Sequence, residues 1–233
     1  LRTIMLSSTY RQDSHISEPQ LAADPKNKFL ARGPRLRLTA EQIRDQALAR
    51  CGVLNPEMYG PPVMPYQPEG IWNSPYSGLK WNKSKNKEQY RRALYTYWKR
   101  TAPYPSMIAF DGVGREVCSA RRIVTNTPLQ ALVTLNDSVY LDLSRKLADR
   151  AAQDTPDKTK KVSNAYTIMT GQPISQASLT ALVALFEQGK AAYELDPELT
   201  RHMCGTVEPD SDYASLVLVA NAILNLDEVI TKS

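Results

Sequence analysis

The spacing of hydrophobic and polar positions predicts helices at both ends of the chain. In the first half, Thr39 and Gln42 stand three residues apart, which is the pattern of a capping box at a helix start. Apolar residues then recur on one helical face until Gly52, which favours a helix end. We therefore expect one helix between Thr39 and Gly52.

The second half carries the stronger helical pattern. Caps such as Thr127 before Pro128, and Ser175, precede runs with an apolar residue every three or four positions. Helices are expected over residues 128–135, 137–152, 157–170, 176–186 and 212–230. The last run, from Asp212 to about Ile230, is apolar on most sides, so we expect it at the centre of a C-terminal bundle.

The middle of the chain has a different texture. Residues 55–78 contain six prolines and three glycines together with several large aromatic side chains, which a flexible linker would not carry. We expect an ordered loop that wraps the core through residues such as Tyr66 and Trp72. Residues 93–98 are rich in strand formers, and residues 107–110 are the expected partner in a small two-stranded element.

These patterns define a mainly α fold with a C-terminal helix bundle, a long proline-rich loop and at most a small two-stranded β element. We divide the chain into residues 1–127, a helical part with the loop and a basic, aromatic segment, and residues 128–233, the bundle, packed on it as one unit. The amphipathic start at Leu1 lacks a capping residue, which favours a piece of a longer protein.

Charge sharpens this picture because it is unevenly distributed. The net charge is +5, and eleven of the 29 Lys and Arg residues but only three of the 24 acidic residues lie between positions 80 and 122. The apolar content of 42% is typical of a globular domain, and no apolar run approaches the length of about 20 residues that a membrane span requires. The basic excess is local, and no nucleic-acid motif accompanies it, so nucleic acid is an unlikely partner.

Arginine and aromatic side chains alternate in this basic segment. Guanidinium groups bind carboxylate, sulfate or phosphate through paired hydrogen bonds, and aromatic faces stack on sugars. The competing interpretation is that the aromatics are core and the arginines are solvated or internally paired. Because adjacent strand residues face opposite ways, Arg91 and Arg92 should not both contact a ligand. The candidate ligand contacts are Arg91, Arg92, Trp98, Arg115, Arg121, Arg122 and Asn126.

Catalytic signals are weak. Asp111 and Glu116 could share acid and base roles in glycoside chemistry, but structural pairing with the neighbouring arginines is the favoured interpretation. His202 and Cys204 are two residues apart, too few ligands for a metal site, so no metal is predicted. Cys118 is expected to be a buried structural thiol. The sequence contains no haem-attachment motif, and it leaves open whether the chain is an enzyme.

Several blocks along the chain together resemble a known family. They lie at residues 8–12, 24–27, 35–41, 65–72, 91–101 and 125–132, and Asn225-Leu226-Asp227-Glu228 near the end fits as well. Among them are Pro-Tyr-Gln-Pro-Glu-Gly-Ile-Trp at 65–72 and Thr-Asn-Thr-Pro-Leu-Gln-Ala-Leu at 125–132. The chain resembles the planctomycete-type family of unknown function numbered fifteen fifty-three.

The resemblance implies a C-terminal region of a large exported protein that often carries a cytochrome-c-like domain. It therefore implies an exported location, other domains of the same protein as partners, and haem on an upstream domain rather than a cofactor in this piece. It brings no catalytic residue. The favoured hypothesis is a binding or scaffold module for anionic or glycan ligands, including anionic polysaccharide, or for partner domains. The alternatives are an enzyme acting on anionic or sulfated carbohydrate and a nucleic-acid binder.

Overall fold

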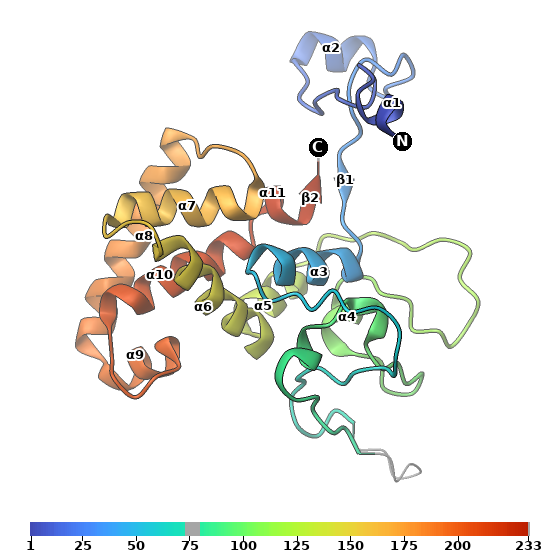
Figure 1. The fold of residues 1–233 in the computed structure, drawn as a ribbon. Helices are drawn as coiled ribbons and strands as arrows, with labels where there is room; N and C mark the ends of the chain where they lie inside the picture. Colours follow the sequence, from blue (N-terminus) through green and yellow to red (C-terminus); the bar gives the residue numbers. More distant parts are fainter. Residues whose placement is uncertain (73–79, 233) are drawn as a thin grey trace.

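A computed structural model describes residues 1–72 and 80–232 of the chain. It confirms the mainly α fold, since the described residues form helices and one small antiparallel sheet (Figure 1). The elements of the first half are α1 (Arg2–Met5), α2 (Glu18–Ala23), β1 (Leu36–Arg37), α3 (Ala40–Arg50), the 3₁₀ helices η1 (Asn86–Tyr90) and η2 (Ala93–Tyr95), and α4 (Pro105–Ala109). Those of the second half are α5 (Pro128–Asn136), α6 (Ser138–Ala152), α7 (Lys158–Thr170), α8 (Gln176–Leu195), α9 (Pro197–Cys204), α10 (Ser211–Leu224), α11 (Asp227–Ile230) and β2 (Thr231–Lys232).

The second half is a helix bundle with α10 at its centre. Helix α10 packs on α6, α7 and α8, and its residues Val217, Val219 and Ile223 are 0% exposed. Apolar residues on most sides of this helix predicted the central position, which is confirmed. Burial of one such side chain contributes about 1.5–3 kcal/mol, so the helix anchors the bundle.

The helix boundaries follow the capping residues closely. Thr39 and Gln42 form the predicted capping box of α3, and Ser175 accepts a hydrogen bond from a backbone N–H at the start of α8. Gly171 ends α7 in the left-handed region at φ 77°, where a residue with a Cβ would be strained. These local signals therefore placed the starts of α3 and α8 and the end of α7, whereas α8 runs on to Leu195, beyond its predicted end at residue 186.

One predicted helix is wrong at its end. The chain does not continue as a single helix from Asp212 to about Ile230, because α10 ends at Leu224 and α11 starts at Asp227. The Asn225 Oδ1 atom accepts a hydrogen bond from the Thr134 hydroxyl at 2.7 Å, and Leu226 is extended with ψ 145°. A contact with α5 therefore turns the chain where the apolar pattern alone continues.

The first half packs directly on the bundle through α3. Ala47 and Leu48 of α3 belong to the same apolar cluster as Leu143 and Leu147 of α6. A second cluster involves the N-terminal half of α3 and combines residues of the first half with one from α11: Ala40, Ile43, Ala93, Tyr104, Met107, Phe110 and Ile230. Helix α3 thus contributes side chains to both cores, and the division of the chain at residue 127 stays a prediction.

The predicted β element is in the wrong place. Residues 93–95 form the 3₁₀ helix η2, and residues 105–109 form helix α4, which begins at a proline. The Ala93 amide donates to the Asp45 carboxylate of α3 at 2.6 Å, and Thr96 forms a single isolated parallel bridge with Val63 rather than pairing with residues 107–110. The observed sheet pairs β1 with β2, whose sequences are too short to give a strand pattern.

The proline-rich segment packs against the body of the chain as far as residue 72. Val63 exchanges hydrogen bonds with the backbone of Tyr95 and Tyr97 at 2.7 Å, and Trp72 is buried against Trp81, with ring centroids 4.8 Å apart. Tyr66 is half-buried, whereas Tyr59 is 83% exposed and does not contribute to the core. The remainder of this predicted loop, residues 73–78, lies outside the described residues.

The N-terminal residues, up to about residue 33, form a small lobe. Figure 1 shows this lobe, in dark blue, apart from the rest of the chain and connected to it through β1. Neither α1 nor α2 has a buried residue.

Within residues 1–72 and 80–232, none of the helices combines the length and apolar character that crossing a bilayer would need.

Candidate anion-binding surface

The sequence candidates gather in part around the loop between α4 and α5, which runs outward from the body (Figure 1). This loop encloses an open depression of about 390 Å³. We call its charged lining the basic loop surface, and it consists of Arg115, Glu116, Arg121 and Arg122. Four of the predicted site residues therefore lie together, and Asp111 lines the same depression.

Asp111 starts the loop in an unusual conformation. Its φ is 61°, in the left-handed region, and its amide donates to the Ile108 carbonyl at 3.0 Å. The next amide, of Gly112, donates to the Met107 carbonyl at 2.7 Å, and together these bonds complete a Schellman ending of α4. A Cβ at Gly112 would lie 2.6 Å from that carbonyl oxygen, so the position requires glycine.

The Asp111 carboxylate is occupied by protein donors. It accepts hydrogen bonds from the Thr125 amide at 2.8 Å, from the Thr125 hydroxyl at 2.7 Å and from the Gln130 side chain at 3.2 Å. Gln130 is itself buried and accepts a hydrogen bond from Arg37. Asp111 therefore connects the start of the loop to its end at Thr125 and to α5. Of the two candidate carboxylates, only Glu116 is exposed to solvent.

Arg91 and Arg92 have opposite surroundings. Arg91 is 2% exposed and donates to the carbonyls of Glu57, Tyr59 and Pro61, while its guanidinium carbon lies 3.8 Å from the centroid of the Tyr95 ring. Arg92 is exposed. The prediction that one of the pair is structural agrees with this geometry, although the two residues do not belong to a strand: they lie between the 3₁₀ helices η1 and η2, with Arg91 in extended backbone. Neither residue lines the depression.

One arginine of the basic loop surface has an acidic protein partner. Arg122 makes a two-pronged pair with Glu41 of α3, with N–O distances of 2.6 and 2.8 Å. This pairing lowers the pKa of Glu41 and raises the pKa of Arg122. Sequence reasoning missed Glu41, because a separation of 81 residues gives no local signal.

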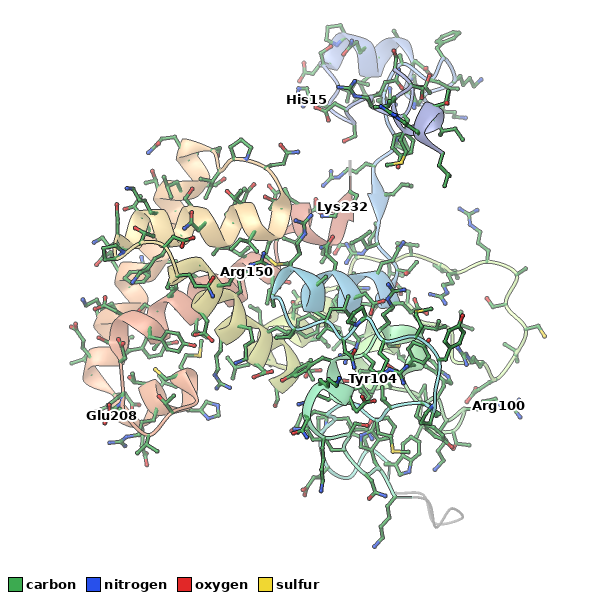
Figure 2. All side chains as sticks on the ribbon, in the orientation of Figure 1. His15, Arg100, Tyr104, Arg150, Glu208 and Lys232 are labelled. Carbon is green, nitrogen blue, oxygen red and sulfur yellow. The ribbon has the colours of Figure 1, made fainter. Side chains whose placement is uncertain are left out.

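Arg115 forms a cation–π contact with Trp98, the aromatic residue of the site. The Arg115 guanidinium carbon lies 5.1 Å from the Trp98 ring centroid, and the indole N–H donates to the Gly114 carbonyl at 3.3 Å. Arg121 and Asn126 are both exposed, and Asn126 directly precedes Thr127, the N-cap of α5. Arg100 lies at the outer edge of the molecule (Figure 2). Arg115 and Arg121 are therefore the surface arginines best placed to contact a ligand.

The cysteines require one correction. Cys118 is exposed, not buried as expected, because it lies in the outward loop. Cys51 and Cys204 are buried, and burial raises the pKa of the Cys51 thiol to about 12. In the part of the chain that the structure describes, no three His, Cys, Asp or Glu side chains come together in a way that could hold a metal ion.

Fold and surface together define a mainly helical module that carries an exposed basic loop and an internally fixed carboxylate. The sequence matches the family described as "Protein of unknown function (DUF1553)" over residues 1–186, and the chain belongs to this family. Neither the curated proteins nor the solved structures contain a match.

Proposed function

We propose that this chain is a non-catalytic binding module for anionic glycans, and that the basic loop surface is its contact region. The observation that carries the proposal is the placement of Arg115 and Arg121 on one open depression beside Trp98. Guanidinium groups match sulfate and carboxylate geometry, and an indole face offers a stacking surface for a sugar ring. Such a surface binds an extended polymer more readily than a small molecule.

The alternatives have less support. An enzyme acting on acidic carbohydrate would need a carboxylate pair, and Asp111 directs its oxygens to Thr125 and Gln130. A nucleic-acid binder would need a basic face, whereas Arg91 is buried and Arg122 is paired with Glu41. The proposal also includes the exported location and partner domains of the same protein, with haem on an upstream domain, that the family resemblance implies.

The test compares dextran sulfate, neutral dextran and duplex DNA as ligands. Replacement of both Arg115 and Arg121 by glutamine should weaken dextran sulfate binding by at least about ten- to a hundredfold, because even one charge-assisted contact contributes about 1.5–3 kcal/mol. The matched control replaces two exposed cations of the bundle by glutamine, Arg201 on α9 and Lys160 on α7, and should change binding less than about twofold.

Three outcomes would overturn the proposal. Equal affinity of the wild type for dextran and dextran sulfate would remove the role of charge. Equal losses in the Arg115, Arg121 variant and in the Arg201, Lys160 control would show that only net charge matters. Tighter binding to DNA than to dextran sulfate would favour a nucleic-acid partner instead.

A further inference from the structure

A buried arginine outside the basic segment has no charged partner. Arg44 lies on the buried side of α3, one residue after Ile43 and one turn before Leu48, and it is only 5% exposed. Its Nη2 atom donates to the Gln89 carbonyl at 2.9 Å, and its Nε atom has no hydrogen-bond partner. Among the described residues, no carboxylate forms an ion pair with it.

This arrangement is costly for a guanidinium. Arginine stays protonated at any physiological pH, so it cannot avoid the cost of burial by losing a proton as lysine does. The ring of Tyr104, which lies inside the first half of the chain (Figure 2), is 5.9 Å from the guanidinium carbon and offers only a weak cation–π contact. A buried cation of this kind requires an anion from elsewhere, or ordered water.

The nearby carboxylates do not fill this role. Asp137 and Asp45 both feel the charge of Arg44, yet burial dominates and raises the pKa of each, whereas a carboxylate tied to a guanidinium has a lowered pKa. Asp137 instead accepts a hydrogen bond from the Val139 amide as the cap of α6, and Asp45 holds the Ala93 amide. Both acids are therefore used by the backbone.

Arg44 lines a pocket of about 330 Å³ between the first half of the chain and α6. The wall from the first half carries Tyr66 and Lys83, whose ammonium lies 5.2 Å from the Tyr66 ring centroid. The wall from α6 carries Ser138 and Asp142, and the Tyr90 hydroxyl donates to Asp142 at 2.8 Å. The pocket thus combines two cations, two aromatic rings and one carboxylate that already has a donor.

We infer that this Arg44 pocket binds a small ligand that carries one oxyanion, a carboxylate or a sulfate, on a compact ring, as in an acidic monosaccharide. The volume lies at the lower end of the range of about 300–1,000 Å³ for ligand sites, which fits one ring rather than a polymer. The oxyanion pairs with Arg44, with exposed Lys83 at the mouth, while Tyr66 and Tyr90 flank the ring. Asp142 and Ser138 supply acceptors for ring hydroxyls.

This site is separate from the basic loop surface. None of the residues that line the Arg44 pocket also lines the loop depression. The inference consequently stands or falls independently of glycan binding at the loop, and variants at Arg115 and Arg121 serve as its controls.

The first experiment uses the wild-type chain. Glucuronate, glucose 6-sulfate and neutral glucose are titrated into ¹⁵N-labelled protein, and the arginine Nε–H resonances are followed by NMR. We expect one of the two acids to shift a slowly exchanging Nε–H signal with a dissociation constant of about 1 mM or tighter, and glucose to leave it unchanged. Whichever acid binds identifies the oxyanion as carboxylate or sulfate.

Variants then assign the signal and test the geometry. The Nε–H signal should be absent in Arg44→Lys, and Lys83→Gln should weaken acid binding about three- to tenfold without loss of fold, because Lys83 is exposed. The Arg115→Gln, Arg121→Gln double variant should bind the acids as the wild type does. If Arg44→Lys does not fold, the wild-type titration and Lys83→Gln still decide the question.

The inference is overturned if neither acid shifts the Arg44 signal at about 10 mM, a concentration well above that of the expected dissociation constant. It is equally overturned if glucose shifts the signal as strongly as the acids, or if Lys83→Gln leaves the affinity unchanged. The first of these outcomes would mean that water or a buffer anion satisfies the guanidinium.

Discussion

Replacement of Arg91 by alanine should destabilise the fold strongly, whereas the same change at Arg92 should not. The Arg91 guanidinium joins three backbone carbonyls of the proline-rich loop, at 3.0 Å for Pro61 and 3.2 Å for Glu57 in addition to Tyr59, and it stacks on Tyr95. No other side chain in the described part of the chain bonds these three carbonyls. The loop from residue 57 to 61 would therefore lose these three bonds and keep the one from the Tyr59 amide to the Tyr95 hydroxyl at 2.6 Å.

The magnitude follows from the hydrogen bonds that are lost. A hydrogen bond from a charged donor contributes about 1.5–3 kcal/mol, but bonds of one side chain are not additive, and the freed carbonyls partly regain water. We expect Arg91→Ala to lower the free energy of unfolding by about 3–4 kcal/mol, close to the upper end of single substitutions. Exposed Arg92→Ala should change it by less than about 0.5 kcal/mol.

Urea unfolding followed by circular dichroism measures both variants against the wild type. The midpoint should fall for Arg91→Ala at an unchanged slope, since a changed slope would indicate a different denatured state rather than a lost contact. Arg91→Lys keeps the charge but cannot reach three acceptors, and it should fall between alanine and wild type. Equal midpoints for Arg91→Ala and Arg92→Ala would refute the structural role of Arg91.

Two further predictions concern the bundle and the thiols. Val217→Asp places an unpaired carboxylate at a 0% exposed position of α10, at a cost of about 3 kcal/mol or more, and should remove the cooperative thermal transition seen by circular dichroism. The control Leu195→Asp, at an 86% exposed position, should melt as the wild type does. Equal melting of the two variants would place α10 outside the core. A thiol reagent at pH 8 should modify one cysteine rapidly in the native chain and three in urea, and Cys118→Ser should abolish the rapid phase, because Cys51 is buried with its pKa raised to about 12 and Cys204 is buried as well. A rapid phase that survives in Cys118→Ser would contradict the burial of the other two.

The parts of the fold that the sequence predicts well are those fixed by short-range interactions. Caps such as Thr39 and Ser175 bond to amides within three residues, and their signals need no knowledge of the tertiary fold. The split between α10 and α11 depends instead on Thr134, which lies 91 residues from Asn225. No periodicity in the sequence encodes that contact, so the continuous helix was the natural but incorrect prediction.

The failed β element has the same origin. Residues 93–98 are strand formers by composition, but strand propensity reflects a fit to a sheet surface, and no sheet is present there for them to join. Asp45 of α3 holds Ala93, and Val63 of the proline-rich loop bonds the neighbouring backbone. Tertiary partners thus replaced the ladder that the composition suggested.

The candidate site shows why a local density of arginines is a weak guide to a ligand. Within the basic segment, Arg91 bonds three carbonyls and Arg122 pairs with Glu41, so these charges are already compensated by the chain. Arg44 lies far from that segment in sequence, in a stretch where acids and bases are nearly balanced, and nothing in the charge pattern marks it. What the pattern of α3 does show is a cation inside the apolar arc between Ile43 and Leu48, a position where burial follows from helical geometry. A charge forced into the interior must find a partner, and its protein neighbours in this case leave that requirement unmet. The periodicity of apolar residues therefore identifies a cation that the fold buries, which a local count of charges does not.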